Sequence, residues 1–290
     1  MKMDFGTSGV HALDSHEART IHAETQTATA TATAAHRATH TSGVKLTVRN
    51  LTMRYPNGHT ALHGMNLSVA AGEMVVVLGS NGSGKSTFMK SVVGLNRPTT
   101  GTVEVAGRDL TALSGKALRE ARLPLALISQ HANLVRRRSV LANVCCGALA
   151  RHRTLAAALG RMPREEIEPA LKYLDEVGLA DLALQRAGTL SGGQAQRVAV
   201  ARALAQIPQV LLADEPVASL DPEAAHEVMR LLRRLATHEQ LAVVVVLHQP
   251  ELATRYADRL VGLRRGRVVF DRPASAVSSR EIADLYVTDA

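Results

Sequence analysis

Two short stretches of this chain carry residue types that can handle phosphate groups. The first is GSNGSGKST, which has the spacing G-x-x-x-x-G-K-[ST] and follows the apolar run EMVVVL. In a loop of this kind, backbone N–H groups surround phosphates, the lysine reaches the β and γ oxygens, and the hydroxyl holds Mg²⁺. We therefore expect Lys85 to contact the phosphates of a nucleotide and Ser86 to hold Mg²⁺. The alternative is a glycine-rich turn without function. The strand predicted before the loop and the helix predicted after it, KSTFMKSVVGL, both argue against this alternative.

The predicted phosphate loop is continuous along the chain. Nine residues form it: Gly79, Ser80, Asn81, Gly82, Ser83, Gly84, Lys85, Ser86 and Thr87.

The second stretch is VLLADEP, in which a run of apolar residues ends in two carboxylates. Open α/β sheets bind ligands at the carboxyl ends of their strands. We expect Asp214 to support Mg²⁺ and Glu215 to act on the attacking water as general base. The alternative is that the two acids are simply a solvated strand end. The phosphate loop in the same chain argues against this alternative.

A third stretch, TLSGGQAQRVAVARAL, places a hydroxyl and two glycines before an alanine-rich helix. Adjacent glycines weaken a helix interior, so they mark a helix start, where free N–H groups and the helix dipole attract anions. Ser191, Gly192, Gly193 and Gln194 are the candidate contacts to an anion. Taken alone, a plain helix start without ligand explains the stretch equally well.

These motifs need elements that position them. Between VKLTVRNLTMRY and LVGLRRGRVVF, predicted strands alternate with helical stretches, and continuous apolar runs such as LAVVVVL are typical of buried parallel strands. The pattern predicts an α/β fold with a parallel sheet and a closing hairpin that turns at residues 264–266. The stretch between about residues 133 and 188 is mainly helical in pattern, which indicates an inserted subdomain.

Composition separates residues 1–43 from the rest. The segment is rich in Ala and Thr, has scattered histidines and lacks apolar periodicity. It has no apolar core of a secretory signal, and we expect a disordered low-complexity tail. Irregular spacing favours solvated histidines there over a metal site.

The chain has 290 residues, a formal net charge of +8 and 2% aromatic residues without tryptophan. A basic chain can bind nucleic acid, anionic membrane or phosphorylated ligands. Stacking aromatics and zinc-finger spacings are missing from the sequence, so we predict no nucleic-acid partner. No apolar run approaches the ~20 residues that span a bilayer. Adjacent Cys145 and Cys146 suit neither a disulfide framework nor a metal site, and are interpreted as buried thiols in a reducing compartment.

A phosphate loop, then LSGGQ, then paired acids about twenty residues later is the motif order of an ABC ATPase, and the chain resembles that family from Val44 onward. The resemblance implies a P-loop ABC ATPase domain over 44–290. Its expected parts are a RecA-like parallel-sheet core, an N-terminal antiparallel β subdomain and an inserted helical subdomain at approximately 131–190. ATP and Mg²⁺ are the expected cofactors.

The resemblance also assigns roles to single residues. Gln130 in LISQHANL matches the glutamine that senses Mg²⁺, and His248 matches the histidine that contacts the γ-phosphate. Together with Glu215 and Lys85 they are the expected catalytic residues, while Ser86, Gln130 and Asp214 form the expected Mg²⁺ site. Asp221 lies in the matching SLD, and Tyr55 resembles the aromatic residue that stacks on adenine.

In the family, the LSGGQ helix start docks on the γ-phosphate held by a second subunit. Ser191 and Gly193 are the implied contacts, so two copies arranged head to tail would close two composite ATP sites.

Three stretches resemble the ATPase subunit of phosphonate importers: NLVRRRSVLANVCCGAL, LADEPVASLDPE and LHQPELATRYADRLVGLRRGRVVFD. That implies two integral membrane permease subunits, indirect dependence on a periplasmic solute-binding protein, and a peripheral place on the cytoplasmic side of the inner membrane. The surface around Gln130 and residues 136–138 is expected to receive the permease. Pro250 and the three arginines at 136–138 depart from the subfamily pattern, which leaves the exact substrate open.

Alternatives remain at this point. An importer of phosphite, phosphate or another small solute such as an amino acid would share every ATP residue. A soluble ABC ATPase of DNA repair or translation is a remoter possibility, because the chain has no heptad runs, no cysteine clusters and only one P-loop.

Overall fold

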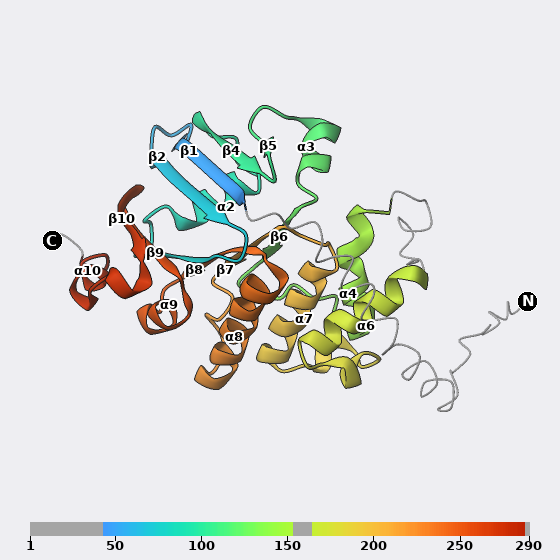
Figure 1. Ribbon diagram of the computed structural model, residues 1–290. Helices are drawn as coiled ribbons and strands as arrows, with labels where there is room; N and C mark the ends of the chain where they lie inside the picture. Colours follow the sequence, from blue (N-terminus) through green and yellow to red (C-terminus); the bar gives the residue numbers. More distant parts are fainter. Residues whose placement is uncertain (1–42, 153–163, 288–290) are drawn as a thin grey trace, which may run out of the picture. The chain divides into compact units, whose positions relative to one another are not determined.

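Two β-sheets organise the residues that the computed structural model describes, which are 43–152 and 164–287 (Figure 1). The first sheet is antiparallel, with the strand order β2-β1-β4-β5. The second has the order β10-β9-β3-β8-β7-β6, and its strands from β9 to β6 are parallel. The hairpin partner β10 runs antiparallel to β9. The α/β fold with a parallel core sheet and an antiparallel β part is thereby confirmed.

The strands of the antiparallel sheet are β1 (Val44–Arg54), β2 (Thr60–Ala70), β4 (Thr100–Val105) and β5 (Arg108–Asp109). Those of the core sheet are β3 (Met74–Leu78), β6 (Leu125–Ile128), β7 (Val210–Asp214), β8 (Ala242–Leu247), β9 (Arg259–Arg264) and β10 (Arg267–Pro273). Strands β2 and β6 were not anticipated from the sequence.

The α-helices are α2 (Lys85–Val92), α3 (Gly115–Ala121), α4 (Val140–Cys145), α6 (Ile167–Glu176), α7 (Gly192–Leu204), α8 (Pro222–Glu239), α9 (Pro250–Tyr256) and α10 (Ser279–Ala283). Short 3₁₀ turns are η1 (Cys146–Ala150), η2 (Arg164–Glu166), η3 (Ala180–Leu182), η4 (Ala187–Thr189) and η5 (Ala274–Ala276).

The core sheet separates two hydrophobic clusters because successive side chains of a strand point to opposite faces. On β3, Val76 packs with residues of α7, α8 and α9, whereas Val75 and Val77 pack with α2 and the antiparallel sheet. Figure 1 shows this division, with α7, α8 and α9 on one side of the sheet and the strands β1 and β2 on the other. Every residue of β3 and β8 is buried, which explains why these strands read as unbroken aliphatic runs.

The described residues between 131 and 190 form helices and 3₁₀ turns joined by loops, with a single isolated bridge between Ser139 and Arg186. The side chain of Ser139 caps α4 by accepting a hydrogen bond from the backbone of Ala142. Helix α4 packs on α6 and α7. A helical subdomain with these approximate limits stays a prediction.

Three further expectations concern the rest of the chain. The tail predicted for residues 1–43 lies, except for Gly43, outside the described residues. Cys145, the last residue of α4, is buried, whereas Cys146, the first residue of η1, is only partly buried; both thiols are free. Across 43–152 and 164–287, no helix is long and apolar enough to cross a membrane.

A buried carboxylate fastens this helical region to the end of α7. Glu166 is 6% exposed, and its Oε2 accepts a hydrogen bond from Arg151 at 2.8 Å while its Oε1 contacts His152. The same Arg151 nitrogen donates to the carbonyl of Ala205 at 2.9 Å. Removing one partner of a buried pair leaves the other charge without compensation, so the loss exceeds the value of a surface ion pair.

We therefore predict that Glu166→Ala lowers the free energy of unfolding by about 3 kcal/mol. Glu165→Ala is the matched control, because the neighbouring carboxylate is 73% exposed and its substitution should cost under ~1 kcal/mol. Urea unfolding followed by circular dichroism measures both values. Equal losses in the two variants would show that the buried contacts of Glu166 do not stabilise the fold.

Candidate functional site

A hollow of ≈ 210 Å³ lies at the carboxyl ends of β3, β7 and β8. The phosphate loop forms one wall, and residues that follow β1, β7 and β8 complete it. Its lining consists of Tyr55, His59, Ala61, Asn81, Gly82, Ser83, Gly84, Lys85, Ser86, Thr87, Glu215 and His248.

Two glycines of the loop are required by close backbone contacts. A Cβ on Gly79 would lie 2.3 Å from the carbonyl oxygen of Leu263, and a Cβ on Gly84 would lie 2.6 Å from that of Ala61. Gly84 also has φ of 109°, which L-residues rarely adopt. Gly82 differs, because a Cβ there would meet nothing within 4 Å. The loop is therefore pressed against the sheet on one side and open on the other.

Helix α2 begins at this loop with its backbone N–H groups available. No side chain caps its N-terminus, and it carries no acidic residue in its first turn. The helix dipole makes such an end favourable for an anion. The hydroxyl of Ser83 is buried without a hydrogen-bond partner and also lines the hollow. These donors fit the oxygens of a phosphate chain.

Lys85 supplies the positive charge of the site. Its Nζ donates hydrogen bonds to the carbonyl oxygens of Gly79 at 2.7 Å and Ser80 at 2.9 Å. Burial lowers the pKa of Lys85, and the nearby carboxylates of Glu215 and Asp214 act in the opposite direction. The ammonium group is thus drawn toward the end of β7 by charge while it is held on the loop by hydrogen bonds.

Glu215 and His248 form a pair that faces the loop. Glu215 Oε1 lies 2.5 Å from His248 Nε2, and both residues line the hollow. Glu215 has φ of 50°, an uncommon conformation for a residue with a side chain, which its backbone N–H supports by bonding to the Val246 carbonyl at 3.1 Å. A strained backbone that is held by its surroundings is frequent at functional sites.

Asp214 ends strand β7 and does not line the hollow itself. Burial raises its pKa, as does the adjacent charge of Glu215, while Lys85, Lys90 and His248 lower it. Two neighbouring carboxylates at one strand end repel each other, and a cation between them and the loop would relieve this repulsion.

Tyr55 directly follows β1 and lines the hollow. Its hydroxyl is 3.1 Å from Thr87 Oγ1 and accepts a hydrogen bond from Asn96 Nδ2 at 3.2 Å. The turn after Tyr55 brings His59 and Ala61 into the lining, which sequence reasoning missed. The signal was available in PNG, since these turn residues send the next strand back beside β1.

Several predicted site residues lie outside this hollow. Gln130 is exposed in the loop after β6, one strand beyond β7. Gly79 and Ser80 do not line the hollow but accept hydrogen bonds from Lys85 with their backbone carbonyls. The structure does not gather Gln130 with Lys85 and Glu215 around one pocket within this chain.

The LSGGQ residues also lie apart from the hollow. Ser191 caps α7 in a capping box with Gln194, and a Cβ on Gly193 would lie 2.9 Å from the Cβ of Ala224 on α8. Asp221 caps α8 by accepting a hydrogen bond from the Ala224 backbone at 2.9 Å. The LSGGQ residues and Asp221 therefore form one packed unit at the starts of two helices, and none of them lines the chain's own phosphate loop.

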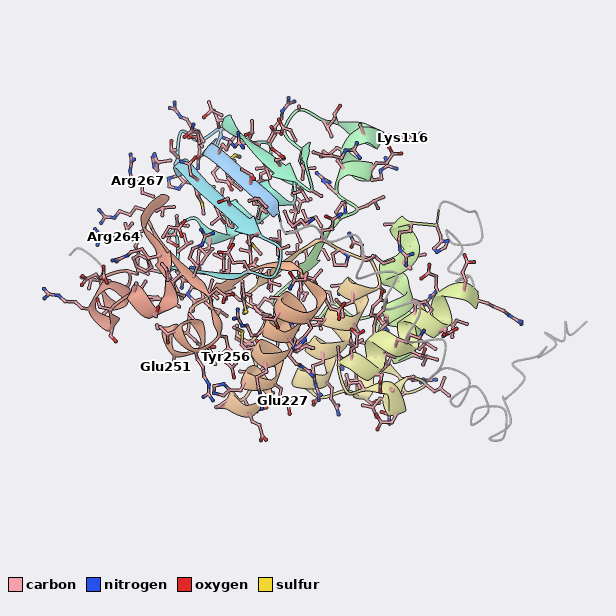
Figure 2. All side chains as sticks on the ribbon, in the orientation of Figure 1. Lys116, Glu227, Glu251, Tyr256, Arg264 and Arg267 are labelled. Atoms are coloured by element: carbon pink, nitrogen blue, oxygen red, sulfur yellow. The ribbon has the colours of Figure 1, made fainter. Side chains whose placement is uncertain are left out.

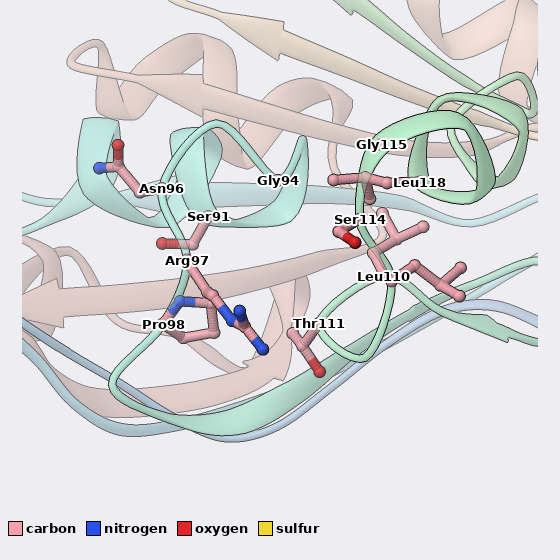
Figure 3. Close-up of a pocket in the computed structure, with 11 residues that line it drawn as sticks. Ser91, Gly94, Asn96, Arg97, Pro98, Leu110, Thr111, Ser114, Gly115 and Leu118 are labelled. Carbon is pink, nitrogen blue, oxygen red and sulfur yellow. The ribbon is translucent and has the colours of Figure 1, made fainter.

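A second hollow of similar volume, ≈ 200 Å³, lies between the loop after α2 and helix α3 (Figure 3). Figure 3 shows Arg97 and Pro98 on one side, and Leu110, Thr111 and Leu118 on the other. It contains none of the predicted site residues, so volume alone does not identify the functional site.

Comparison with known proteins gives consistent results. Residues 62–218 match the family model described as ABC transporter. "Phosphonates import ATP-binding protein PhnC" of Shouchella clausii is 44% identical over 241 residues, 83% of this chain and 91% of that protein. The protein of the same name from Frankia casuarinae is 50% identical over 227 residues, 78% of this chain and 90% of that protein.

Solved structures agree with this similarity. The cbiO1 protein from Clostridium perfringens, described as part of the ABC transporter complex cbiONQ, is 28% identical with a TM-score of 0.73, covering 83% of this chain and 93% of that one. The ATP-binding cassette MJ0796, solved as a dimer in a post-hydrolysis state with ADP and Pi, is 32% identical with a TM-score of 0.68. The matched region covers 79% of this chain and 98% of the MJ0796 chain.

The raised pKa of Asp214 predicts how stability depends on pH. A carboxyl group whose pKa is raised by folding stabilises the fold only while protonated, so this contribution is present below its unfolded pKa and lost as pH rises through its folded pKa. Asp214→Asn should therefore raise the free energy of unfolding at pH 7, and the gain should shrink toward zero below about pH 4. Urea unfolding of both proteins at the two pH values measures it. A variant that is less stable than the wild type at pH 7 would contradict the assigned direction.

Proposed function

The chain belongs to the ABC transporter family, and from this premise we propose that it is the ATP-hydrolysing subunit of an importer that takes up phosphonates. The observation that carries the proposal is the hollow in which the phosphate loop and Lys85 face the Glu215–His248 pair. The names of relatives at 41–50% identity over most of the chain support phosphonate as the solute class.

The residues around the hollow suit ATP and Mg²⁺. The N–H groups of the loop from Gly79 to Thr87 and the uncapped start of α2 would bind the phosphates, and Tyr55 would stack on the adenine. The unpartnered Ser83 hydroxyl is a further donor for a phosphate oxygen.

Hydroxyl, amide and carboxylate oxygens are the ligands that Mg²⁺ prefers. Ser86, which lines the hollow, would hold it together with Asp214 at the end of β7, and Gln130 would join them if the loop after β6 moves toward the hollow. The charge of Mg²⁺ would neutralise the phosphate oxygens. Burial and the neighbouring charge of Glu215 together raise the pKa of Asp214, and a bound cation would offset both effects.

Hydrolysis requires a water molecule to attack the γ-phosphorus while the bond from that phosphorus to the β,γ-bridging oxygen breaks. Glu215 would orient this water and accept its proton, and ADP would leave with the bridging oxygen. His248, 2.5 Å from Glu215, holds the carboxylate in position and would contact the γ-phosphate. Lys85 balances the negative charge on the phosphate oxygens.

The proposed site includes residues that lie apart from the phosphate loop of the same chain. Ser191, Gly192, Gly193, Gln194 and Asp221 lie outside its own hollow. We propose that a second copy, arranged head to tail, places them against the γ-phosphate. The dimeric state of the MJ0796 cassette, which resembles this chain at 32% identity, supports that arrangement.

An importer of this kind also requires partner proteins. Two integral membrane permease subunits would bind the surface around Gln130 and residues 136–138, and a periplasmic solute-binding protein would deliver the solute to them. The chain would then lie peripherally on the cytoplasmic side of the inner membrane. Closure of the dimer on ATP and its reset by hydrolysis would drive the permease between two states.

Glu215→Gln tests the catalytic assignment. The amide cannot accept a proton, so we predict a loss of steady-state ATP hydrolysis of about 100-fold or more with retained ATP binding. The trapped dimer should elute earlier on size-exclusion chromatography with ATP. Lys85→Ala provides the contrast, because it should weaken nucleotide binding itself, as measured by calorimetry. Hydrolysis at the wild-type rate by Glu215→Gln would refute the role of this residue.

Growth on a phosphonate tests the transported solute. In a host that uses methylphosphonate as sole phosphorus source and has no second importer, deletion of the gene should abolish growth on methylphosphonate but not on inorganic phosphate. Wild-type protein should restore growth and Glu215→Gln should not. Undiminished growth of the deletion strain on methylphosphonate would direct attention to phosphite, phosphate or another small solute.

A further inference from the structure

The parallel strands β3 and β8 separate at the edge of the functional site. Their register runs from Met74 opposite Val243 to Leu78 opposite Leu247. Beyond this last pair, β3 turns into the phosphate loop at Gly79, and β8 continues into His248. Buried backbone groups at such a point need hydrogen-bond partners from elsewhere in the fold.

A tyrosine from the far end of the described chain reaches this point. The hydroxyl of Tyr286 donates a hydrogen bond to the carbonyl oxygen of His248 at 3.4 Å. Burial raises the pKa of Tyr286, and a hydrogen bond between its hydroxyl and the backbone of Gly79 lowers it by less. The phenol therefore stays protonated at neutral pH and can bridge the two strand ends.

The segment that carries Tyr286 is fixed by several contacts. Ile282 and Leu285 are 4% and 2% exposed and belong to the same hydrophobic cluster as Leu247. Ser278 and Glu281 form a capping box at the start of α10, and Glu281 pairs with Arg272 on β10.

The β9–β10 hairpin adds one more tether. Arg264, which Figure 2 shows near Arg267 at this hairpin, donates a hydrogen bond to the Asp284 carbonyl at 3.4 Å. The position of Tyr286 is thus set by packing and hydrogen bonds on both sides of it.

We propose that Tyr286 is a positioning residue that sets the distance between the phosphate loop and His248. It holds the backbone of His248, whose ring contacts Glu215, and the first residue of the loop whose carbonyl binds Lys85. The inference rests on the proposed ATPase function, because it concerns the alignment of the same catalytic groups. A small displacement of reacting groups can lower a rate strongly without weakening substrate binding.

The test compares Tyr286→Phe with Tyr256→Phe in the full-length protein. Both variants lose one tyrosine hydroxyl from a part-buried hydrogen bond, but Tyr256 on α9 (Figure 2) bonds to His226 on α8 at 2.9 Å, and neither of these two residues lines the hollow. We expect Tyr286→Phe to lower kcat for ATP about threefold to tenfold while KM and the thermal midpoint change as little as in Tyr256→Phe.

Hydrogen–deuterium exchange gives a readout that does not need activity. In Tyr286→Phe the backbone amides near Gly79 and His248 should exchange faster than in the wild type, and in Tyr256→Phe they should not. Unchanged exchange at both strand ends, or equal loss of kcat in the two variants, would overturn the positioning role. A wild-type protein that hydrolyses no ATP would instead refute the proposed function, and the exchange comparison would still decide whether Tyr286 joins the two strand ends.

Discussion

The parallel pairing of β3, β8 and β7 is the constraint on which the site depends. Leu78 lies opposite Leu247 and Asp214 opposite Val246, so the three strands end at one edge of the sheet within a residue of each other. This edge therefore brings together the loop with Lys85, the acids at the end of β7, and His248 after β8. Lys85 and His248 are 163 residues apart in the sequence. Every side chain of β3 and β8 is buried, so both strands lie entirely within the hydrophobic core.

Burial and neighbouring charges have opposite effects on the ionisable groups at this edge of the sheet. Burial disfavours the charged forms of Lys85 and Asp214, while their mutual attraction favours both, and Glu215 disfavours the charge on Asp214. The lysine rests on the carbonyls of its own loop rather than on a carboxylate. Its charge thus remains directed at the space where phosphates would lie, and the acids retain capacity for a cation.

The two halves of the predicted ATP site, the phosphate loop and the LSGGQ residues, have different structural bases. The phosphate loop depends on glycines that tolerate close backbone approach, whereas the LSGGQ half depends on two capped helices that pack together through Gly193 and Ala224. None of the residues of the second half lines the hollow that the first half forms. The head-to-tail dimer that we propose would bring the two halves together.

The sequence by itself determined the family, the α/β fold class and the order of the motifs, because a phosphate loop, LSGGQ and ADEP are local patterns whose chemistry needs fixed spacing. It also marked the buried strands, since β3 and β8 lie between two hydrophobic layers and must be aliphatic throughout. Only the tertiary structure decided which groups meet. It brought Glu215 into contact with His248 and Tyr286 into contact with the backbone of His248. It also placed His59 and Ala61 in the lining of the hollow and left Gln130 out of it. These arrangements depend on residues that are distant in sequence or oriented by neighbouring elements. Such contacts are set by strand register and packing, which act across the fold and leave no local pattern in the chain.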